Sequence, residues 1–306
     1  MTQAPDRTAL GIGLILASVT AMAFADAVVK YVSADLTLWQ VFVARSLFAI
    51  PCLVVLARLR RTPLAVRHGG WVLVRSLLLV LTWLAFYASL PVLKLSVAAV
   101  AVYTNPILTA LLTALVLRER VLPRQWLGVL IGFGGIAAIL KPGADDFSWF
   151  VLLPLLAALL YSSAMVLTRA KCRDEEATTL ALGLHGAFIA AGLIAIGILA
   201  AAAVAPADQA AYPFLLGDWR PMDLRAWGTM AFLGVLSAFF FLGVARAYQI
   251  APPQIIGTFD YGYLVSAALW GLVFFAEVPD RWTMAGMVLI TVAGLLVAAP
   301  SRRSSG

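Results

Sequence analysis

The sequence is poor in charge, in histidine and in cysteine. Charged residues make up 12% of the 306 positions and hydrophobic residues 63%, whereas an ordinary soluble domain carries about 25% charged residues. This composition excludes a soluble globular protein. The 2 histidines fall short of the clustered side chains that an integral membrane enzyme would need. Cys52, in an apolar run, and Cys172, in a polar loop, allow no disulfide framework and no metal-binding spacing, so we expect reduced thiols.

Motifs of nucleotide and hydrolase chemistry are also missing. The sequence contains no GxGxxG, no GxxxxGK, no HExxH and no GxSxG. The glycine pairs that it does contain, such as Gly11 with Gly13, lie in long apolar runs that cannot cradle a phosphate. We therefore expect no cofactor, no metal and no enzymatic activity. Any work that the chain performs would have to draw on a gradient.

Long apolar runs are what the sequence has instead. A bilayer core of about 30 Å requires about 20 apolar residues in a helix, and ten runs of roughly that length follow one another along the chain. The runs extend from Thr8 to Val32, Thr37 to Ala57, Trp71 to Pro91, Leu95 to Leu117, Arg124 to Leu140, Phe147 to Thr168, Thr178 to Val204, Arg225 to Tyr248, Gln254 to Ala276 and Arg281 to Ala299.

The runs predict an all-α integral membrane protein with ten transmembrane helices. A β-barrel would alternate in polarity over segments of about ten residues, and the chain does not. Lipid offers no hydrogen-bond partners, so each run must satisfy its own backbone as a helix. Ala21-Met22-Ala23 resembles a signal-peptide cleavage site, but the apolar run continues beyond it. We expect this first helix to be retained.

The distribution of basic residues predicts the orientation. With a cytoplasmic N-terminus, 13 Lys and Arg residues fall in cytoplasmic loops and tails and 5 fall outside. Because cytoplasmic loops are enriched in Lys and Arg, we expect a multi-pass protein of a bacterial-type inner membrane with both termini in the cytoplasm. The formal net charge of +7 then follows from topology and gives no reason to expect a nucleic-acid partner.

The chain also contains an internal repeat. Tyr103 precedes Glu119 by 16 residues, and Tyr261 precedes Glu277 by the same 16. Glycines follow each glutamate at the same distance. We therefore predict two five-helix repeats, residues 1–142 and 143–306. Because five is odd, the second copy has inverted topology, which is typical of transporters that work by alternating access. A receptor or scaffold that arose by duplication is the alternative.

These features resemble the drug/metabolite transporter superfamily, EamA type. The resemblance rests on the five-plus-five helices, on the glutamate that ends the fourth and ninth runs before a glycine-patterned run, and on the spacing of Lys30 and Arg45 across the first loop. It covers about residues 8 to 300. The second half departs from it, because Leu167 and His185 lie near the positions that match Lys30 and Arg45.

The resemblance implies a ten-helix basket around a central cavity that binds a small-molecule substrate. Helices one, three, four, six, eight and nine would line this cavity. Many members of the family export amino acids or related metabolites, so the expected function is secondary active export of small metabolites, amino acids first. Efflux of drugs or cationic compounds, transport of another metabolite, and a membrane receptor or scaffold are the alternatives.

Ionisable residues within the runs are candidate functional groups, because they are costly in lipid unless paired or hydrated. Asp26 and Lys30 share a face of the first run, and Arg45 lies at a matching depth in the second. Arg246 and Asp260 lie at similar depths near the cytoplasmic side. Each group predicts either a structural ion pair or a gate. The first group is also a candidate contact for a substrate carboxylate, and Asp260 is also a candidate proton-linked carboxylate.

Other charged and small residues have weaker signals. Arg75 is expected to extend to the lipid headgroups, and Glu119 and Glu277 are expected to cap a helix or to contact an arginine in a loop. Gly128 and Gly132 form a GxxxG motif, which indicates either close helix packing or a homodimer through helices five and ten.

Polar and aromatic residues at mid-membrane depth are the candidate substrate contacts. Hydroxyl and amide groups suit the charged ends of an amino acid, and aromatic faces suit both an ammonium group and an apolar side chain. The alternative is that these residues serve interhelical packing. The set consists of Trp83, Tyr87, Tyr103, Asn105, Tyr161, Ser163, Tyr261 and Tyr263.

Overall fold

The computed structural model describes residues 7–117, 123–140, 148–251, 256 and 259–298. Helix is present in every one of the ten predicted runs. The helices are α1 (Thr8–Val32), α2 (Leu38–Leu59), α3 (Gly69–Ser89), α4 (Leu95–Val102), α5 (Asn105–Leu117), α6 (Pro123–Leu140), the 3₁₀ helix η1 (Trp149–Val151), α7 (Leu152–Lys171), α8 (Ala177–Ala202), α9 (Pro206–Ala211), α10 (Pro213–Leu216), α11 (Leu224–Ile250), α13 (Gly262–Phe275) and α14 (Arg281–Ala298).

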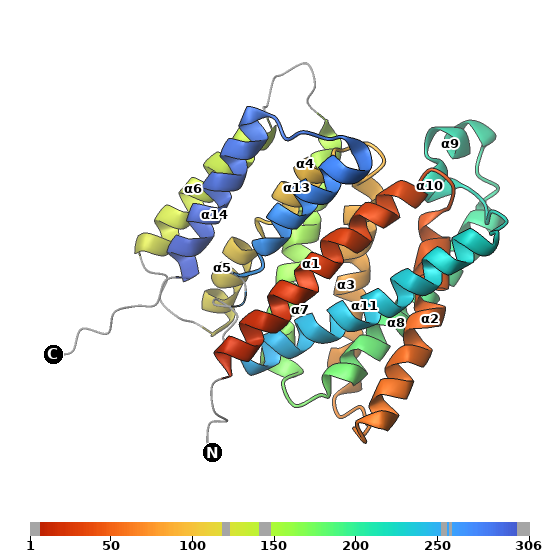
Figure 1. Ribbon diagram of the computed structural model, residues 1–306, viewed down its shortest axis with the longest axis horizontal. Coiled ribbons are helices and arrows are strands. Elements are labelled where there is room, and N and C mark those ends of the chain that lie inside the picture. Colours follow the sequence, from red (N-terminus) through yellow and green to blue (C-terminus); the bar gives the residue numbers. More distant parts are fainter. Residues whose placement is uncertain (1–6, 118–122, 141–147, 252–255, 257–258, 299–306) are drawn as a thin grey trace.

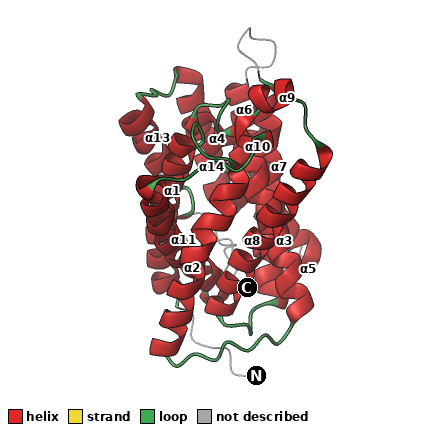
Figure 2. Ribbon diagram, turned by 90° about the vertical axis from the view of Figure 1, so that its right-hand side faces the viewer, coloured by secondary structure: helices red, strands yellow, loops and turns green. Residues whose placement is uncertain are grey.

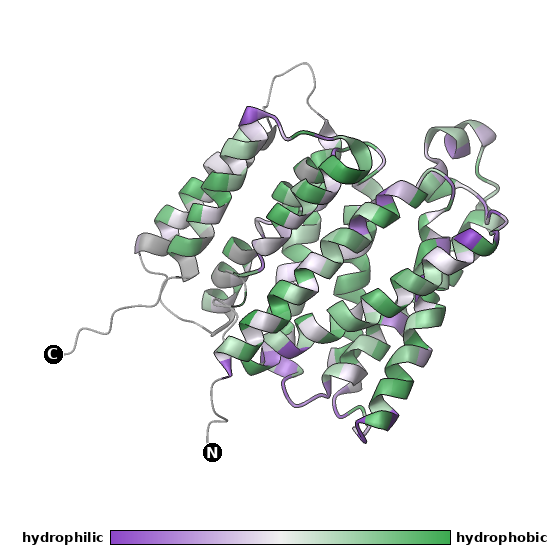
Figure 3. Cartoon of the chain, viewed as in Figure 1, coloured by the Kyte–Doolittle hydropathy of each residue, from purple (hydrophilic) through white to green (hydrophobic). Residues whose placement is uncertain are grey.

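The surface of this helical bundle is that of a membrane protein. Within the described residues, seven helical segments are long and apolar enough to cross a bilayer, and shorter apolar helices accompany them. Figure 3 shows apolar residues along the lengths of the helices and hydrophilic residues mainly at helix ends and loops. Leu115, Leu130 and Val265 are each more than half exposed on their helices. Exposed apolar surface of this extent is explained by contact with lipid.

Local sequence signals fix several helix boundaries. Thr37 caps α2, because its side chain accepts from the Gln40 backbone N–H while the Gln40 side chain accepts from the Thr37 N–H. The Asp223 carboxylate caps α11 by accepting from Ala226 N–H at 2.7 Å. The Asp280 carboxylate accepts from the backbone N–H groups at the start of α14.

The helices run between two loop-bearing faces, as Figure 2 shows from the side. α1 packs along α11 and α13, α2 packs along α8 and α11, and α3 packs along α7 and α8. α6 and α14 pair with each other at one side of the bundle (Figure 1). Helices from the first and second halves of the chain therefore alternate throughout the core.

Two of the predicted spans are interrupted within their lengths. The fourth span breaks at Tyr103 and Thr104, between α4 and α5. Pro106, the second residue of α5, lacks the N–H that a continuous helix would donate. The ninth span has a turn at Asp260 and Tyr261, just before α13. Tyr103 and Tyr261 are equivalent in the internal repeat, and their ring centroids lie 6.3 Å apart. The two interruptions therefore meet in the bundle.

Loops are anchored at both ends of the bundle. At the end where α1 begins, the Glu175 carboxylate accepts from the backbone N–H groups of Arg67 and His68 and so joins the α7–α8 loop to the α2–α3 loop. At the opposite end, Trp39 donates to the Leu215 carbonyl at 2.8 Å, which fixes α10 against α2 (Figure 1).

The glycine-patterned helix α6 packs within its own chain. A Cβ atom at Gly132 would meet Ile107 of α5 and Ala293 of α14, and one at Gly135 would meet Ile290 and the Gly286 carbonyl. Intrachain packing therefore uses this face. A homodimer through the two helices stays a prediction.

Candidate functional site

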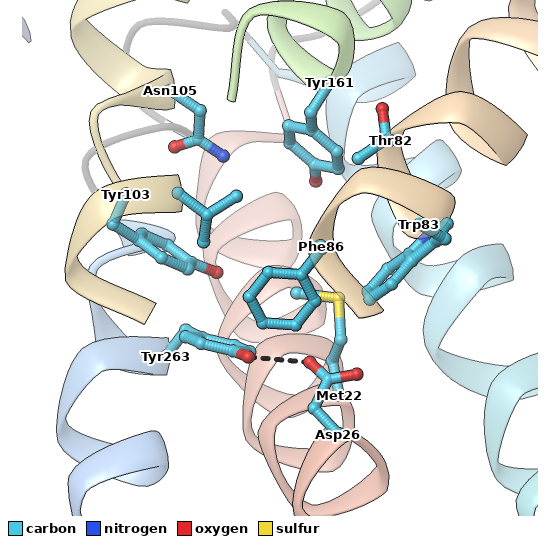
Figure 4. A pocket seen from close by; sticks show the side chains of 10 residues that line it. Met22, Asp26, Thr82, Trp83, Phe86, Tyr103, Asn105, Tyr161 and Tyr263 are labelled. Carbon is cyan, nitrogen blue, oxygen red and sulfur yellow. Dashed lines mark hydrogen bonds between the residues drawn. The ribbon is translucent and has the colours of Figure 1, made fainter. Parts of the chain in front are cut away.

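A cavity lies in the middle of the bundle and is lined from both halves of the chain. α1, α3 and the interrupted fourth span contribute from the first half, and α7 and α13 contribute from the second. Figure 4 shows the side chains converging from these helices. The lining consists of Met22, Asp26, Thr82, Trp83, Phe86, Val102, Tyr103, Asn105, Tyr161 and Tyr263.

The cavity is small in this conformation. Its space open to the centres of water-sized spheres is about 30 Å³, which holds about two water molecules. A metabolite requires a pocket of a few hundred Å³. The cavity therefore has no room for a metabolite in this arrangement of the helices.

Three polar groups on the cavity wall are unsatisfied within the described part of the chain. The indole Nε1 of Trp83, the amide oxygen of Asn105 and the hydroxyl of Tyr161 are buried and have no hydrogen-bond partner there. Buried polar groups are rarely left without a partner in proteins. The cavity wall is therefore built to hydrogen-bond to water or to a bound molecule.

Asp26 is the acidic group of the cavity. Its side chain is fully buried, and both carboxylate oxygens accept hydrogen bonds, from Tyr87 OH at 3.0 Å and from Tyr263 OH at 2.7 Å. Arg45 donates to the Tyr87 hydroxyl at 3.1 Å. The predicted proximity of Asp26 and Arg45 thus takes the form of a relay through Tyr87.

Arg45 is held among aromatic rings. Its guanidinium lies 4.9 Å from the ring centroid of Phe188 and 5.9 Å from that of Phe241, in positions typical of cation–π contacts. His185, near the position that matches Arg45 in the other half, accompanies these rings and contacts the Ser46 hydroxyl at 3.1 Å. Arg45 therefore contacts ring faces and the Tyr87 hydroxyl in place of a direct carboxylate partner.

Lys30 pairs with Glu277 instead of Asp26. The Lys30 ammonium lies 2.8 Å from the Glu277 carboxylate and also donates to the Leu93 carbonyl at 2.6 Å. The other Glu277 oxygen accepts from Leu95 N–H at 2.8 Å. These contacts join α1, the start of α4 and the segment after α13. Glu119, the repeat equivalent of Glu277, lies outside the described residues.

Asp260 lies behind the cavity wall and is likewise buried. Its Oδ2 atom accepts from Tyr248 OH at 2.8 Å, and its Oδ1 atom has no partner among the described residues. Arg246, which the sequence places at the same depth, is exposed. In the described residues, an ion pair joins Lys30 to Glu277, the His68 ring lies 3.5 Å from the Glu175 carboxylate, and neither contact involves Asp260.

The structure brings most of the predicted contact residues together. Trp83, Tyr103, Asn105, Tyr161 and Tyr263 line the cavity. Tyr87 and Tyr261 pack behind it through contacts with Trp83 and Tyr103. Ser163 does not line it, and its hydroxyl donates to the Leu159 carbonyl of its own helix.

Sequence reasoning missed several lining residues. Met22 lies one helical turn from Asp26, and Phe86 lies one turn from Trp83, with ring centroids 6.0 Å apart. Their spacing of three or four residues from predicted positions is the signal that would have found them.

The expected position of Arg75 at the headgroups is wrong. This side chain is 2% exposed, and its Nε donates to Thr168 Oγ1 at 2.7 Å. Helices α3 and α7 pack closely enough to enclose it, and the hydroxyl and the Leu180 carbonyl supply acceptors within the protein.

Comparisons with known proteins place the chain in a family. Residues 9–141 match the EamA-like transporter family. The chain is 30% identical over 268 residues to the riboflavin transporter of Rhizobium johnstonii, covering 87% of this chain and 80% of that protein. It is 28% identical to the pseudopaline exporter of Pseudomonas aeruginosa, covering 92% and 94%, and 23% identical to the S-adenosylmethionine uptake transporter of Rickettsia bellii, covering 99% and 98%.

A solved structure has the same fold. A chain of known crystal structure superposes with a TM-score of 0.65 at 17% identity, covering 95% of this chain and 97% of that chain. The fold and the cavity are those of a multi-pass membrane transporter of small metabolites, not of an enzyme. The chain belongs to the EamA-like transporter family.

Proposed function

We propose that this protein is a secondary transporter of a bacterial-type inner membrane that exports small metabolites carrying an ammonium or other cationic group. Amino acids and their derivatives are the first class to test. The observation that carries this proposal is the buried Asp26 carboxylate in an aromatic cavity whose wall also holds groups of Trp83, Asn105 and Tyr161 with no hydrogen-bond partner among the described residues. A carboxylate and aromatic faces both attract an organic cation, and the unpartnered groups offer hydrogen bonds to its polar parts.

The relatives support a substrate of this kind without fixing it. Proteins similar to this chain are named for riboflavin, pseudopaline and S-adenosylmethionine, which are chemically unlike one another. Aromatic side chains such as Tyr103 and Trp83 line the cavity and would offer ring faces on which a flat ring system could stack. A cationic centre requires Asp26, whereas a neutral flavin does not, and this difference separates the candidate substrates.

We further propose that residues 1–142 and 143–306 are inverted repeats that move against each other. In the repeat, α1, α3 and α6 of the first half are equivalent to α7, α11 and α14 of the second. The contact of α3 with α7 is therefore equivalent to that of α11 with α1, and the contact of α6 with α14 is equivalent to itself. Interrupted helices at the centre of such repeats are a common feature of transporter binding sites. Separation of the halves on alternate sides would open the cavity to each face in turn, with Lys30 and Glu277 as a gate at one end.

Counterflow into proteoliposomes tests the substrate class. The full-length protein would be loaded with unlabelled amino acids, S-adenosylmethionine, riboflavin or a lipophilic organic cation, and uptake of the same labelled compound would be measured. We expect counterflow of at least one cationic or ammonium-bearing compound. Asp26→Asn should weaken its apparent affinity about 10- to 100-fold, because a hydrogen bond to a charged group contributes about 1.5–3 kcal/mol.

Asp35→Asn is the matched control, because Asp35 is an exposed acid in the loop after α1 and should leave counterflow unchanged. Counterflow of riboflavin alone, with no effect of Asp26→Asn, would reject a cationic substrate. Preference for the organic cation over every amino acid would favour the drug-efflux alternative.

A further inference from the structure

The two buried carboxylates of the bundle have different surroundings. Asp26 has a hydroxyl donor on each oxygen and lies near the Arg45 guanidinium. Asp260 has one hydroxyl donor, from Tyr248, and no ion-pair partner in the part of the chain that the structure describes. An ionised carboxylate without compensation in an apolar interior costs several kcal/mol. Asp26 therefore has more compensation for a carboxylate charge than Asp260 has among the described residues.

The groups that face Asp260 are hydroxyls. Tyr248 comes from α11, Tyr103 from the end of α4 and Tyr161 from α7, and Tyr261 is its neighbour in the chain. Each of these four tyrosines interacts electrostatically with the Asp260 carboxylate. The Arg75 guanidinium of α3 also interacts electrostatically with Tyr161. A proton on Oδ1 would create an O–H donor on the atom that has no partner in the described part of the chain.

We propose that Asp260 is the binding site of a coupling proton, separate from the substrate site at Asp26. A proton from the aqueous side adds to Oδ1 to form the neutral acid, and it leaves from the same atom to water on the other side of the membrane. This inference rests on the proposed transport function, and it assigns the energy source that drives it.

Tyrosines connect the proton site with the substrate cavity. Tyr103 lines the cavity and stacks on Tyr263, with ring centroids 4.6 Å apart, and Tyr263 donates to Asp26. Tyr161 also lines the cavity. A substrate that displaces either ring changes the surroundings of Asp260, and a change of charge on Asp260 changes the two rings. This shared wall gives the two sites a direct means of coupling.

Asp260 also lies at a position suited to conformational control. It occupies the turn that precedes α13, where the ninth span is interrupted. Its Tyr248 contact ties this turn to the end of α11. A neutral acid needs less solvation than a carboxylate. Protonation of Asp260 therefore allows this turn to lie in the apolar interior while the halves move. The ionised form of Asp260 favours conformations in which the site is open to water.

Two measurements on the full-length protein in proteoliposomes test this proposal. With a compound that shows counterflow, an imposed gradient of about one pH unit should sustain up to about tenfold accumulation for one proton per substrate. Asp260→Asn, which imitates the neutral acid, should abolish that accumulation while counterflow continues. Asp35→Asn should keep both activities, since its side chain is exposed in a loop.

Infrared difference spectroscopy between acidic and alkaline buffer supplies a readout that needs no substrate. The carbonyl band of a titrating protonated carboxyl group should disappear in Asp260→Asn and shift its pH midpoint in Tyr248→Phe, which removes the hydroxyl donor alone. If no compound shows counterflow, this band still tests the proton site while the transport proposal fails.

Three results would overturn the proposal. The first is pH-driven accumulation that persists in Asp260→Asn. The second is a carboxyl band that this variant retains and Asp26→Asn loses. The third is accumulation that follows a sodium gradient and ignores pH.

Discussion

At the scale of single residues, the protein tolerates charge in an apolar bundle by giving each charged group a specific set of partners. Lys30 and Glu277 are each 13% exposed and share an ion pair, and each also contacts the backbone near the start of α4. Arg45 lies against aromatic rings. Because these arrangements differ, substitution of each residue should have a different consequence.

Removal of either partner from the Lys30–Glu277 pair should destabilise the protein. Lys30→Met or Glu277→Gln leaves the other group partly buried without its counter-charge, and we expect a loss of about 1–3 kcal/mol in unfolding free energy. The double variant should lose less than the sum of the two, with an interaction energy of about 1–2 kcal/mol. Equilibrium unfolding in detergent measures all three. Additive losses would show that the pair contributes no interaction of its own.

At the scale of elements, close approach of helix backbones decides the shape of the core. α11 contacts α2 where Gly234 faces the Arg45 carbonyl, and a Cβ atom there would lie 2.5 Å from that oxygen and 3.1 Å from the Ala49 nitrogen. Both are backbone atoms, which cannot rotate away. The glycine therefore fixes the distance between the helix that carries Arg45 and its neighbour.

Gly234→Ala and Gly228→Ala should have opposite effects, although both residues lie on α11. The first forces α2 and α11 apart, which we expect to cost about 1–3 kcal/mol. The second places its methyl group in open space, with nothing within 4 Å, and should be neutral or stabilise by up to about 1 kcal/mol through helix propensity. Thermal unfolding followed by tryptophan fluorescence compares them. Equal effects of the two substitutions would contradict close packing at Gly234.

At the scale of the whole molecule, both ends of the bundle are tied and the cavity between them is small. Glu175 holds the loops at the end where α1 begins, and Lys30 with Glu277 holds helices nearer the other end. The proposed alternating access requires these contacts to break in turn. The loop that carries α9 and α10 lies opposite the α2–α3 loop (Figure 1), so one of the two faces the cytoplasm.

Cysteine labelling in intact cells tests the predicted orientation. An impermeant maleimide should label Asp208→Cys on α9 in intact cells and should label Arg60→Cys, at the end of α2, after permeabilisation. Both positions are exposed. The wild-type chain is the background control, because Cys172 is buried and Cys52 is half-buried within α2. The reverse labelling pattern would invert the assigned topology.

Much of the fold could be predicted from the sequence because lipid imposes a simple rule. Each apolar run must form its own backbone hydrogen bonds, so helix is found in all ten runs and α1 has the predicted bounds of Thr8–Val32. Tyr103, Tyr161 and Tyr263 were predicted by their depth and line the cavity. Glu277 was marked by its repeat spacing, and it accepts from the first N–H of α4, but its charge partner is Lys30 and not an arginine. These are properties of single helices or of intervals along the chain, and no tertiary contact is needed to recognise them.

Only the tertiary structure decided which of these residues face one another. Lys30 shares a helix face with Asp26, yet it pairs with Glu277, 247 positions away. Arg75 is enclosed between α3, α7 and α8 and does not reach the headgroups, and Ser163 points away from the cavity while Tyr161 lines it. Helix periodicity gives the face of a residue but not the rotation of that helix against its neighbours. Side-chain packing fixes that rotation, and with it the position of each charge.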